Sequence, residues 1–80
     1  MDLREAIAVR IQQLCKDNNI TPNKLATISG LSRSSVKSIL NGASQNPQIR
    51  LIKAICDGLD ISLKEFFSDP IFDKVDQEIK

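Results

Sequence analysis

The stretch LATISGLSRSSVKSIL, residues 25–40, has the pattern of an amphipathic helix that is interrupted in its middle by Ser29-Gly30. A glycine directly after the last residue of a helix readily adopts the left-handed conformation that ends the helix and turns the chain. Ser32 then supplies a side-chain oxygen that can cap a new helix. The sequence therefore predicts two short helices that meet at a tight corner, and this corner limits what the rest of the chain can build.

Helical periodicity extends over most of the 80 residues. Apolar residues recur every three or four positions over residues 2–17 and again over residues 47–58, which predicts a first and a fourth helix. The second and third helices are expected over residues 22–28 and 32–41. The apolar positions of the first and fourth helices, which we expect to face the core, are Leu3, Ile7, Ile11, Leu14, Ile49, Ile52, Ile55, Cys56 and Leu59. No strand pattern is visible, so the predicted class is all-α.

The predicted helices begin at residues that can cap them. Asp2 precedes the first helix. Thr21-Pro22 and Asn46-Pro47 each place a capping side chain before a proline, which is favoured at the first helical position. Ser62 and Glu65 have the spacing of a capping box and open a fifth helix.

Residues 69–80 form a separate segment after the domain that we assign to residues 1–68. Asp69-Pro70 marks a further helix start, and Ile71, Val75 and Ile79 are spaced by four residues. This spacing predicts an amphipathic tail helix with one apolar side. That side either packs on the first or fifth helix of the same chain or pairs with the same helix of a second subunit.

Charge is distributed unevenly along the chain, although the net charge is only +1. Residues 18–56 contain five basic residues and no acidic residue, whereas residues 57–80 contain seven acidic and three basic residues. A central block without acids is typical of a surface that faces a polyanion.

Several other classes of function are not supported by the composition. There is no histidine, and Cys15 and Cys56 lie on apolar helical stripes, so we expect buried thiols and no metal, cofactor or small-molecule ligand. Paired carboxylates in a pocket and a glycine-rich phosphate loop are both missing, and we expect no enzyme. Without a run of about 18 apolar residues, we expect no membrane association and a cytoplasmic protein.

The two helices around Gly30, with the small Ala26 where they must pack closely, describe a helix-turn-helix. Ala26, Gly30, Val36 and Ile39 stand at the spacings that this motif uses. From about residue 3 to Phe67, including L-S-R-S-S-V-K-S-I-L-N-G and L-D-I-S-L-K-E-F-F, the chain resembles the phage repressor and Cro-like family, also called XRE-type transcriptional regulators. The resemblance implies a compact five-helix, lambda-repressor-like domain.

The resemblance also implies a function, which is sequence-specific binding of double-stranded DNA by a transcriptional regulator. Residues 32–41 would be the recognition helix in the major groove, where an arginine can bridge the O6 and N7 atoms of guanine. The positions implied to read bases are Arg33, Ser34, Lys37 and Ser38. The positions implied to contact phosphates are Thr21, Asn23, Asn41, Ser44, Gln45 and Asn46.

Two departures from the family pattern bear on affinity. Many members have glutamine at the position of Pro22, where the side chain helps to hold a phosphate. Residues 43–45, Ala-Ser-Gln, lack the Lys or Arg that relatives often carry there. Fewer charged contacts predict modest affinity per monomer, and hence a homodimer on a palindromic operator. An alternative is a protein-interaction module, antitoxin-like or an anti-repressor, which the acidic residues 57–80 would support.

Overall fold

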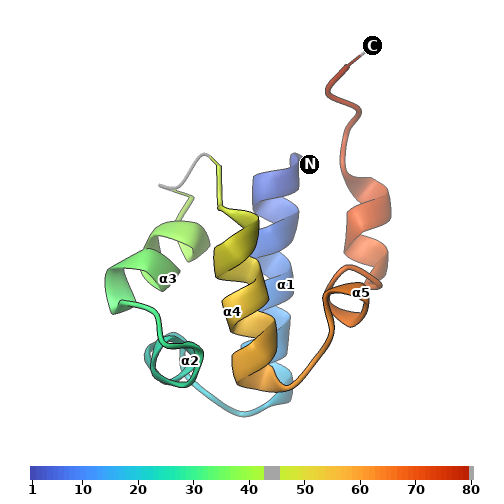
Figure 1. Cartoon of the computed structure of the whole chain (residues 1–80). Helices are drawn as coiled ribbons and strands as arrows, with labels where there is room; N and C mark the ends of the chain where they lie inside the picture. The colour runs from blue at the N-terminus through green and yellow to red at the C-terminus, as the bar shows by residue number, and fades with distance from the viewer. Residues whose placement is uncertain (43–45, 80) are drawn as a thin grey trace.

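The computed structural model describes residues 1–42 and 46–79. Within these residues the chain forms five α-helices and one 3-10 helix, which Figure 1 shows in their arrangement. They are α1 (Leu3–Asp17), α2 (Pro22–Ser29), α3 (Arg33–Leu40), α4 (Ile49–Leu59), α5 (Leu63–Phe66) and the 3-10 helix η1 (Pro70–Lys74). No strand occurs in this part of the chain, which confirms the predicted all-α class.

One hydrophobic core joins all five α-helices. Its buried side chains come from α1, α2, α3, α4 and α5 in turn: Ile7, Ile11, Leu14 and Cys15, then Leu25 and Ala26, then Val36 and Ile39, then Ile52, Ile55 and Cys56, and finally Phe66. Full burial of one large aliphatic or aromatic side chain contributes about 1.5 to 3 kcal/mol. The core therefore holds α2 and α3 to the body formed by α1 and α4.

Side-chain caps begin most of the helices, as the sequence predicts. Asp2, Thr21, Ser32 and Ser62 each accept a hydrogen bond from the backbone N–H three residues later. The distances from donor nitrogen to acceptor oxygen are 2.8 to 3.1 Å. These caps confirm the predicted starts of α1, α2, α3 and α5.

The predicted start of the fourth helix at Asn46-Pro47 is wrong. Gln48 remains extended, with φ −69° and ψ 139°, and α4 begins at Ile49 without a side-chain cap. The Gln48 carbonyl accepts the first backbone hydrogen bonds of this helix, from the N–H groups of Leu51 and Ile52. Ile49, predicted to face the core, lies in this first turn and is 60% exposed.

The predicted amphipathic helix over residues 69–80 is also wrong, because helical structure ends after the five residues of η1. Val75 turns extended, with φ −72° and ψ 131°. The next amide, that of Asp76, donates to the Met1 carbonyl over 2.9 Å instead of to a helical carbonyl. Phe72 packs against the core, and η1 contacts α1. Part of the tail segment thus seals the core of its own chain.

Both cysteines are buried and unpaired, which confirms the prediction that they act as small apolar residues. Burial raises the pKa of the Cys15 thiol and is the main cause that raises the pKa of the Cys56 thiol. Since the thiolate is the reactive form, both sulfurs are protected in the folded chain.

α2 approaches α4 at backbone distance, at Gly58. A Cβ atom built on Gly58 would lie 2.7 Å from the Ser29 Oγ and 2.9 Å from the Ile28 carbonyl oxygen. Both distances are shorter than van der Waals contact, so only glycine fits here. The missing side chain allows the end of α2 to rest directly on α4.

Arg10 connects α1 to the C-terminal end of α5 through a buried guanidinium group. Its Nε and Nη2 atoms donate to the carbonyls of Phe66 and Glu65, over 2.7 and 2.9 Å. Nη1 lies 3.5 Å from the Asp69 Oδ2, and the guanidinium carbon lies 5.9 Å from the centre of the Phe66 ring. One side chain thus satisfies the last carbonyls of α5 and holds the start of η1.

Substitution of Gly58 by alanine should lower the free energy of unfolding by about 1 to 3 kcal/mol, because the added methyl group overpacks the contact between α2 and α4. Alanine would gain about 1 kcal/mol in an unhindered helix position. Urea unfolding followed by circular dichroism measures the net effect. A more stable variant would show that the two helices do not touch at backbone distance.

Arg10→Met should cost about 3 kcal/mol, because the Phe66 and Glu65 carbonyls lose their donor and the Asp69 carboxylate loses its partner. Arg10→Lys keeps the charge but loses the forked geometry, and it should recover only part of the loss. Calorimetric unfolding of the three proteins checks the order native, lysine, methionine. Equal stability of native and methionine forms would contradict the proposed role of the guanidinium.

Candidate nucleic-acid interface

The corner between α2 and α3 has the geometry that the sequence predicts. Gly30 adopts the left-handed conformation, with φ 68° and ψ 25°. The Leu31 amide donates back to the Ala26 carbonyl over 3.0 Å, which closes the turn. Ala26 is buried, so α3 packs closely over α2 at this point. The corner thereby fixes the direction of α3.

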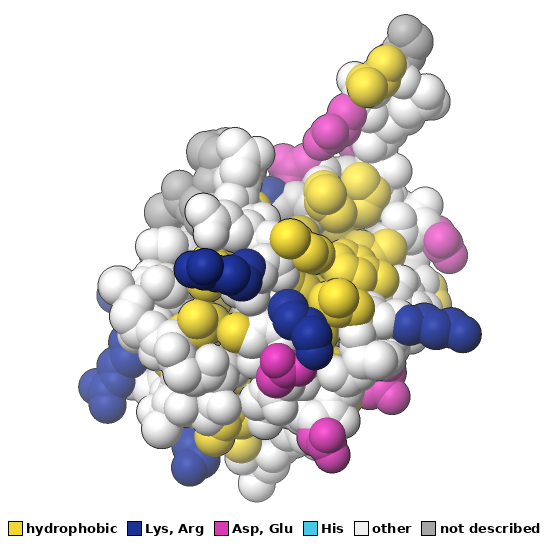
Figure 2. All heavy atoms as spheres, viewed as in Figure 1, with side chains coloured by type: hydrophobic (Ala, Val, Ile, Leu, Met, Phe, Trp, Pro, Cys, Tyr) yellow, Lys and Arg dark blue, Asp and Glu magenta, His cyan; other side chains and the backbone are white. Residues whose placement is uncertain are grey.

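The orientation of α3 about its own axis follows from its two buried residues. Val36 and Ile39 are each 1% exposed and point into the core. Arg33 and Lys37 are both exposed on this helix. In Figure 2, Lys and Arg side chains are visible on the side where Figure 1 has α2 and α3, and no acidic side chain is visible at that edge of the view.

A hollow of about 450 Å³ lies between the start of α2 and the exposed side of α3, and we call it the α2–α3 hollow. Five of the predicted site residues line it, although they are spread over two helices and their caps. These residues are Thr21, Asn23, Arg33, Lys37 and Asn41. Pro22 and Leu40 complete the lining. The hollow thus combines two cations with hydroxyl and amide groups.

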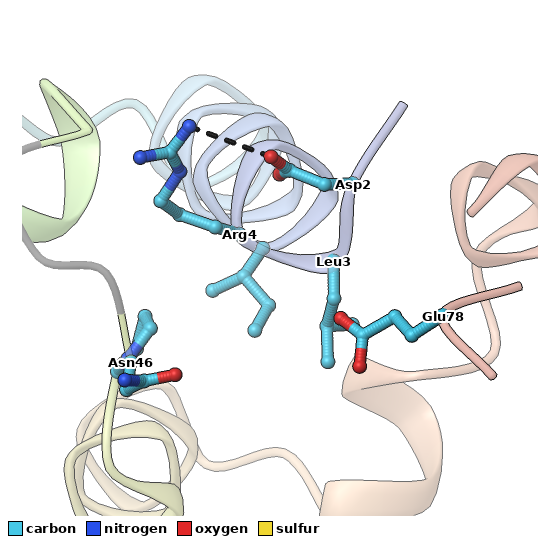
Figure 3. A pocket seen from close by; sticks show the side chains of 7 residues that line it. Asp2, Leu3, Arg4, Asn46 and Glu78 are labelled. Carbon is cyan, nitrogen blue, oxygen red and sulfur yellow. Dashed lines mark hydrogen bonds and ion pairs between the residues drawn. The ribbon is translucent and has the colours of Figure 1, made fainter. Parts of the chain in front are cut away.

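The remaining predicted residues lie elsewhere. Ser34 is exposed and Ser38 is half-buried on α3, and neither lines the α2–α3 hollow. Asn46 lines a different hollow, next to Asp2, Arg4 and Glu78 (Figure 3). The predicted contacts Ser44 and Gln45 fall outside the described residues.

The two charged residues that line the α2–α3 hollow, Arg33 and Lys37, are both cations. Among the described residues, no carboxylate forms an ion pair with Arg33, Lys37 or the nearby Lys24. The ion pairs found in this part of the chain involve Met1, Arg4, Arg10 and Lys53 instead. The cations at the hollow are therefore available to an external anion.

Thr21 and Ser32 already use a side-chain oxygen as an acceptor for their own helix. Each hydroxyl still carries a hydrogen that it can donate. The Ser32 Oγ lies 2.8 Å from the Ser35 Oγ and 3.2 Å from the Ser34 Oγ, so the hydroxyls at the start of α3 form a connected group. This group lies in the first turn of α3, which also contains Arg33.

Arg4 is a residue that sequence reasoning missed. Its Nη1 atom donates to the Gly42 carbonyl over 3.2 Å, directly after the last turn of α3. The bond joins positions that are 38 residues apart, and no local pattern in the sequence indicates it. Arg4 therefore ties the end of α3 to α1, at the edge of the segment that was predicted to contact phosphates.

The described residues contain no group of carboxylate and thiol side chains that could hold a metal ion. Within the same residues, every helix is too short or too polar to cross a membrane.

Comparisons with known proteins agree with this geometry. A family described as the Cro/C1-type HTH DNA-binding domain matches residues 10–70. Among solved structures, the crystal structure of the prophage Lp1 protein 11 superposes with a TM-score of 0.81. That protein is 33% identical, and the match covers 94% of this chain and 100% of that chain. No curated protein matches the sequence.

Arg4→Met should loosen the end of α3 while leaving the core intact, because the Gly42 carbonyl loses a charge-assisted hydrogen bond of about 1.5 kcal/mol. Hydrogen exchange should become faster for the amides near Asn41, with little change for the amides of α4. A uniform increase over all helices would instead indicate general destabilisation.

Proposed function

Because this chain belongs to the family of Cro/C1-type helix-turn-helix DNA-binding domains, we propose that it recognises a specific double-stranded DNA sequence and regulates transcription by occupying it. α3 is the element that enters the major groove. An α-helix with its side chains is about 10 to 12 Å across, which suits the major groove, whose width is about 12 Å.

The α2–α3 hollow is the observation that carries this proposal. It gathers two unpaired cations, two amides and a hydroxyl on one surface. Such groups are the usual partners of phosphate oxygens and of base edges in the groove. Thr21 and Asn23, at the start of α2, and Asn41, at the end of α3, line the same hollow as the two cations. Hydroxyl and amide groups in this position can donate to phosphate oxygens.

Sequence reading is assigned to the exposed face of α3. Arg33 lies in the first turn of this helix, where a guanidinium group can make a bidentate contact with guanine. Lys37 lies one turn later and reaches a second base or a phosphate. Ser34 and Ser38 add small side chains that allow the helix to approach the base edges closely.

We also propose that the chain acts as a homodimer on a palindromic operator. Few cations surround the α2–α3 hollow, so one monomer neutralises few phosphates and binds modestly. A two-fold dimer presents two recognition helices and doubles the number of contacts. Two half-sites one DNA turn apart, about 34 Å, would then be read together.

The second candidate is a protein-interaction module. It keeps the fold but binds a protein partner that recognises an acidic surface. The seven acidic residues in positions 57–80 favour it. Selection from a pool of random duplex DNA, at low and at physiological salt, separates the two functions. Enrichment of one motif at physiological salt supports DNA recognition, and the absence of any enriched motif at either salt concentration overturns it.

Arg33→Ala should weaken binding to the selected DNA by about 1 to 3 kcal/mol and relax the preference at one base position. Lys64→Ala removes one exposed cation from α5, outside the α2–α3 hollow, and serves as the matched control. Fluorescence anisotropy with selected and scrambled duplexes measures both effects. An equal loss on the two duplexes would assign Arg33 to a phosphate.

A further inference from the structure

We propose that Arg4, on α1, is a positioning residue for DNA recognition, although it lies outside the α2–α3 hollow. Its guanidinium group holds the Gly42 carbonyl, which fixes the end of α3 and the direction in which the chain leaves this helix. The inference rests on the proposed DNA-binding function and deepens it, because it assigns part of the sequence preference to a side chain that touches no nucleotide.

Arg4 meets the chain directly after the last turn of α3. Its Nη1 atom donates to the Gly42 carbonyl over 3.2 Å, in a partly buried position. The Asn41 amide closes α3 by donating to the Lys37 carbonyl, and Gly42 then adopts a left-handed φ of 78°. Since a peptide group is planar, a bond to its carbonyl orients the whole group. Arg4 thereby fixes the turn with which the chain leaves α3.

The guanidinium group is itself held in place from α1. The Asp2 carboxylate divides its two oxygens between two partners. Its Oδ1 atom accepts from the Glu5 amide over 2.8 Å and caps α1, and its Oδ2 atom lies 3.4 Å from the Arg4 Nη2 atom (Figure 3). The Arg4 side chain is 28% exposed. Because it is held on two sides, this side chain can hold the end of α3 at a defined distance from the start of α1.

Arg4 also borders both ends of the connection between α3 and α4. It lines a hollow of about 310 Å³ together with Asn41 and Gly42. It lines a second hollow, of about 320 Å³, together with Asn46 and Pro47. Asn41 and Asn46 are predicted phosphate contacts. One side chain of α1 therefore lies against both ends of the segment that is predicted to hold the DNA backbone.

Two carboxylates make Arg4 unsuitable as a phosphate contact of its own. Asp2 lies against the guanidinium group, and Glu5 lines the same 310 Å³ hollow as Arg4. A phosphate that approached this arginine would meet both negative charges, and juxtaposed like charges oppose binding. Arg33 and Lys37 differ in this respect, because the described lining of their hollow contains no carboxylate. We therefore assign to Arg4 an action through Gly42 and not on the nucleic acid.

The position of α3 matters because base contacts tolerate little displacement. Recognition groups must be held within about 0.5 Å of their productive geometry. The corner at Gly30 holds the start of α3, the buried Val36 and Ile39 hold its middle, and Arg4 holds its end. When the bond from Arg4 is lost, the backbone contacts beside α3 no longer fix its register on the duplex. Base contacts then weaken, whereas the general attraction to phosphates remains.

Arg4→Met should weaken binding to the selected duplex about 10-fold, because one charge-assisted hydrogen bond is lost, and it should change binding to a scrambled duplex much less. Fluorescence anisotropy well below the melting temperature measures the ratio of the two affinities, which should fall. The slope of log affinity against log salt should stay the same. An equal loss on both duplexes, with a slope reduced by about 0.9, would show that Arg4 binds a phosphate itself and would overturn the proposal.

Two further variants separate positioning from a general loss of stability. Arg4→Lys keeps one charged donor for the Gly42 carbonyl but loses the forked geometry, so it should restore part of the affinity ratio. Phe72→Leu is the matched control, because it weakens ring packing with Phe66 and Phe67 on the side of the body opposite to α3 (Figure 1). It should lower the melting temperature and leave the ratio unchanged. A ratio that falls equally in Phe72→Leu would overturn the positioning role.

Asp2→Asn tests whether the two side chains act through one contact. Asparagine caps a helix as well as aspartate does, so α1 keeps its start, but the carboxylate that holds Arg4 is removed. The ratio of affinities should fall, and Arg4→Met should then cause a smaller further fall than it causes in the native chain. Strictly additive effects would place the two residues in separate roles and contradict the proposed arrangement.

Selection with the native chain distinguishes failure of this inference from failure of the proposed function. If no motif is enriched, the proposed function fails and the positioning role falls with it, whereas hydrogen exchange still reports whether Arg4 holds the end of α3. If the native chain prefers one motif and Arg4→Met keeps the native ratio of affinities, the positioning role fails alone.

Discussion

The backbone contact between α2 and α4 is the constraint on which the rest of the structure depends. Gly58 lets the last turn of α2, with the Ser29 side chain, lie directly against α4. A Cβ atom added at Gly58 would lie only 2.9 Å from the Ile28 carbonyl oxygen. The next residues are Ser29 and Gly30, where the chain turns into α3. Because the corner connects α2 directly to α3, any displacement of α2 would also move Arg33 and Lys37. The residue that orients the candidate interface is thus one that has no side chain and lies outside it.

Features that depend on neighbouring residues could be predicted from the sequence. The left-handed Gly30 and the caps at Asp2, Thr21 and Ser32 rest on chemistry within three or four residues, so local sequence is sufficient. Asn46-Pro47 carries the same local signal, but Gln48 stays extended and α4 starts later. The buried face of α4, with Ile52, Ile55 and Cys56, is retained despite this shift. The apolar periodicity therefore predicted the presence of this helix more reliably than the capping signal predicted its first residue.

Features that depend on distant residues could not be predicted in the same way. The Met1 carbonyl competes with the helical carbonyls for the Asp76 amide, and this bond spans the whole chain. Gly58 looks like an ordinary glycine in a helix until α2 is placed against it. The candidate site is an intermediate case. The residues of α3 could be predicted because they lie on one face of a single helix. The position of Thr21 and Asn41 at one hollow depends on the geometry of the corner between α2 and α3.

The fold separates the basic and acidic parts of the chain, and this separation has a physical consequence. The basic block, residues 18–56, contains α2, α3 and the cations at the α2–α3 hollow. The acidic residues follow from the end of α4 onward, through α5, η1 and the tail. In the proposed complex, DNA attracts the first region and repels the second, so diffusional encounters are biased toward the orientation in which α3 meets the groove.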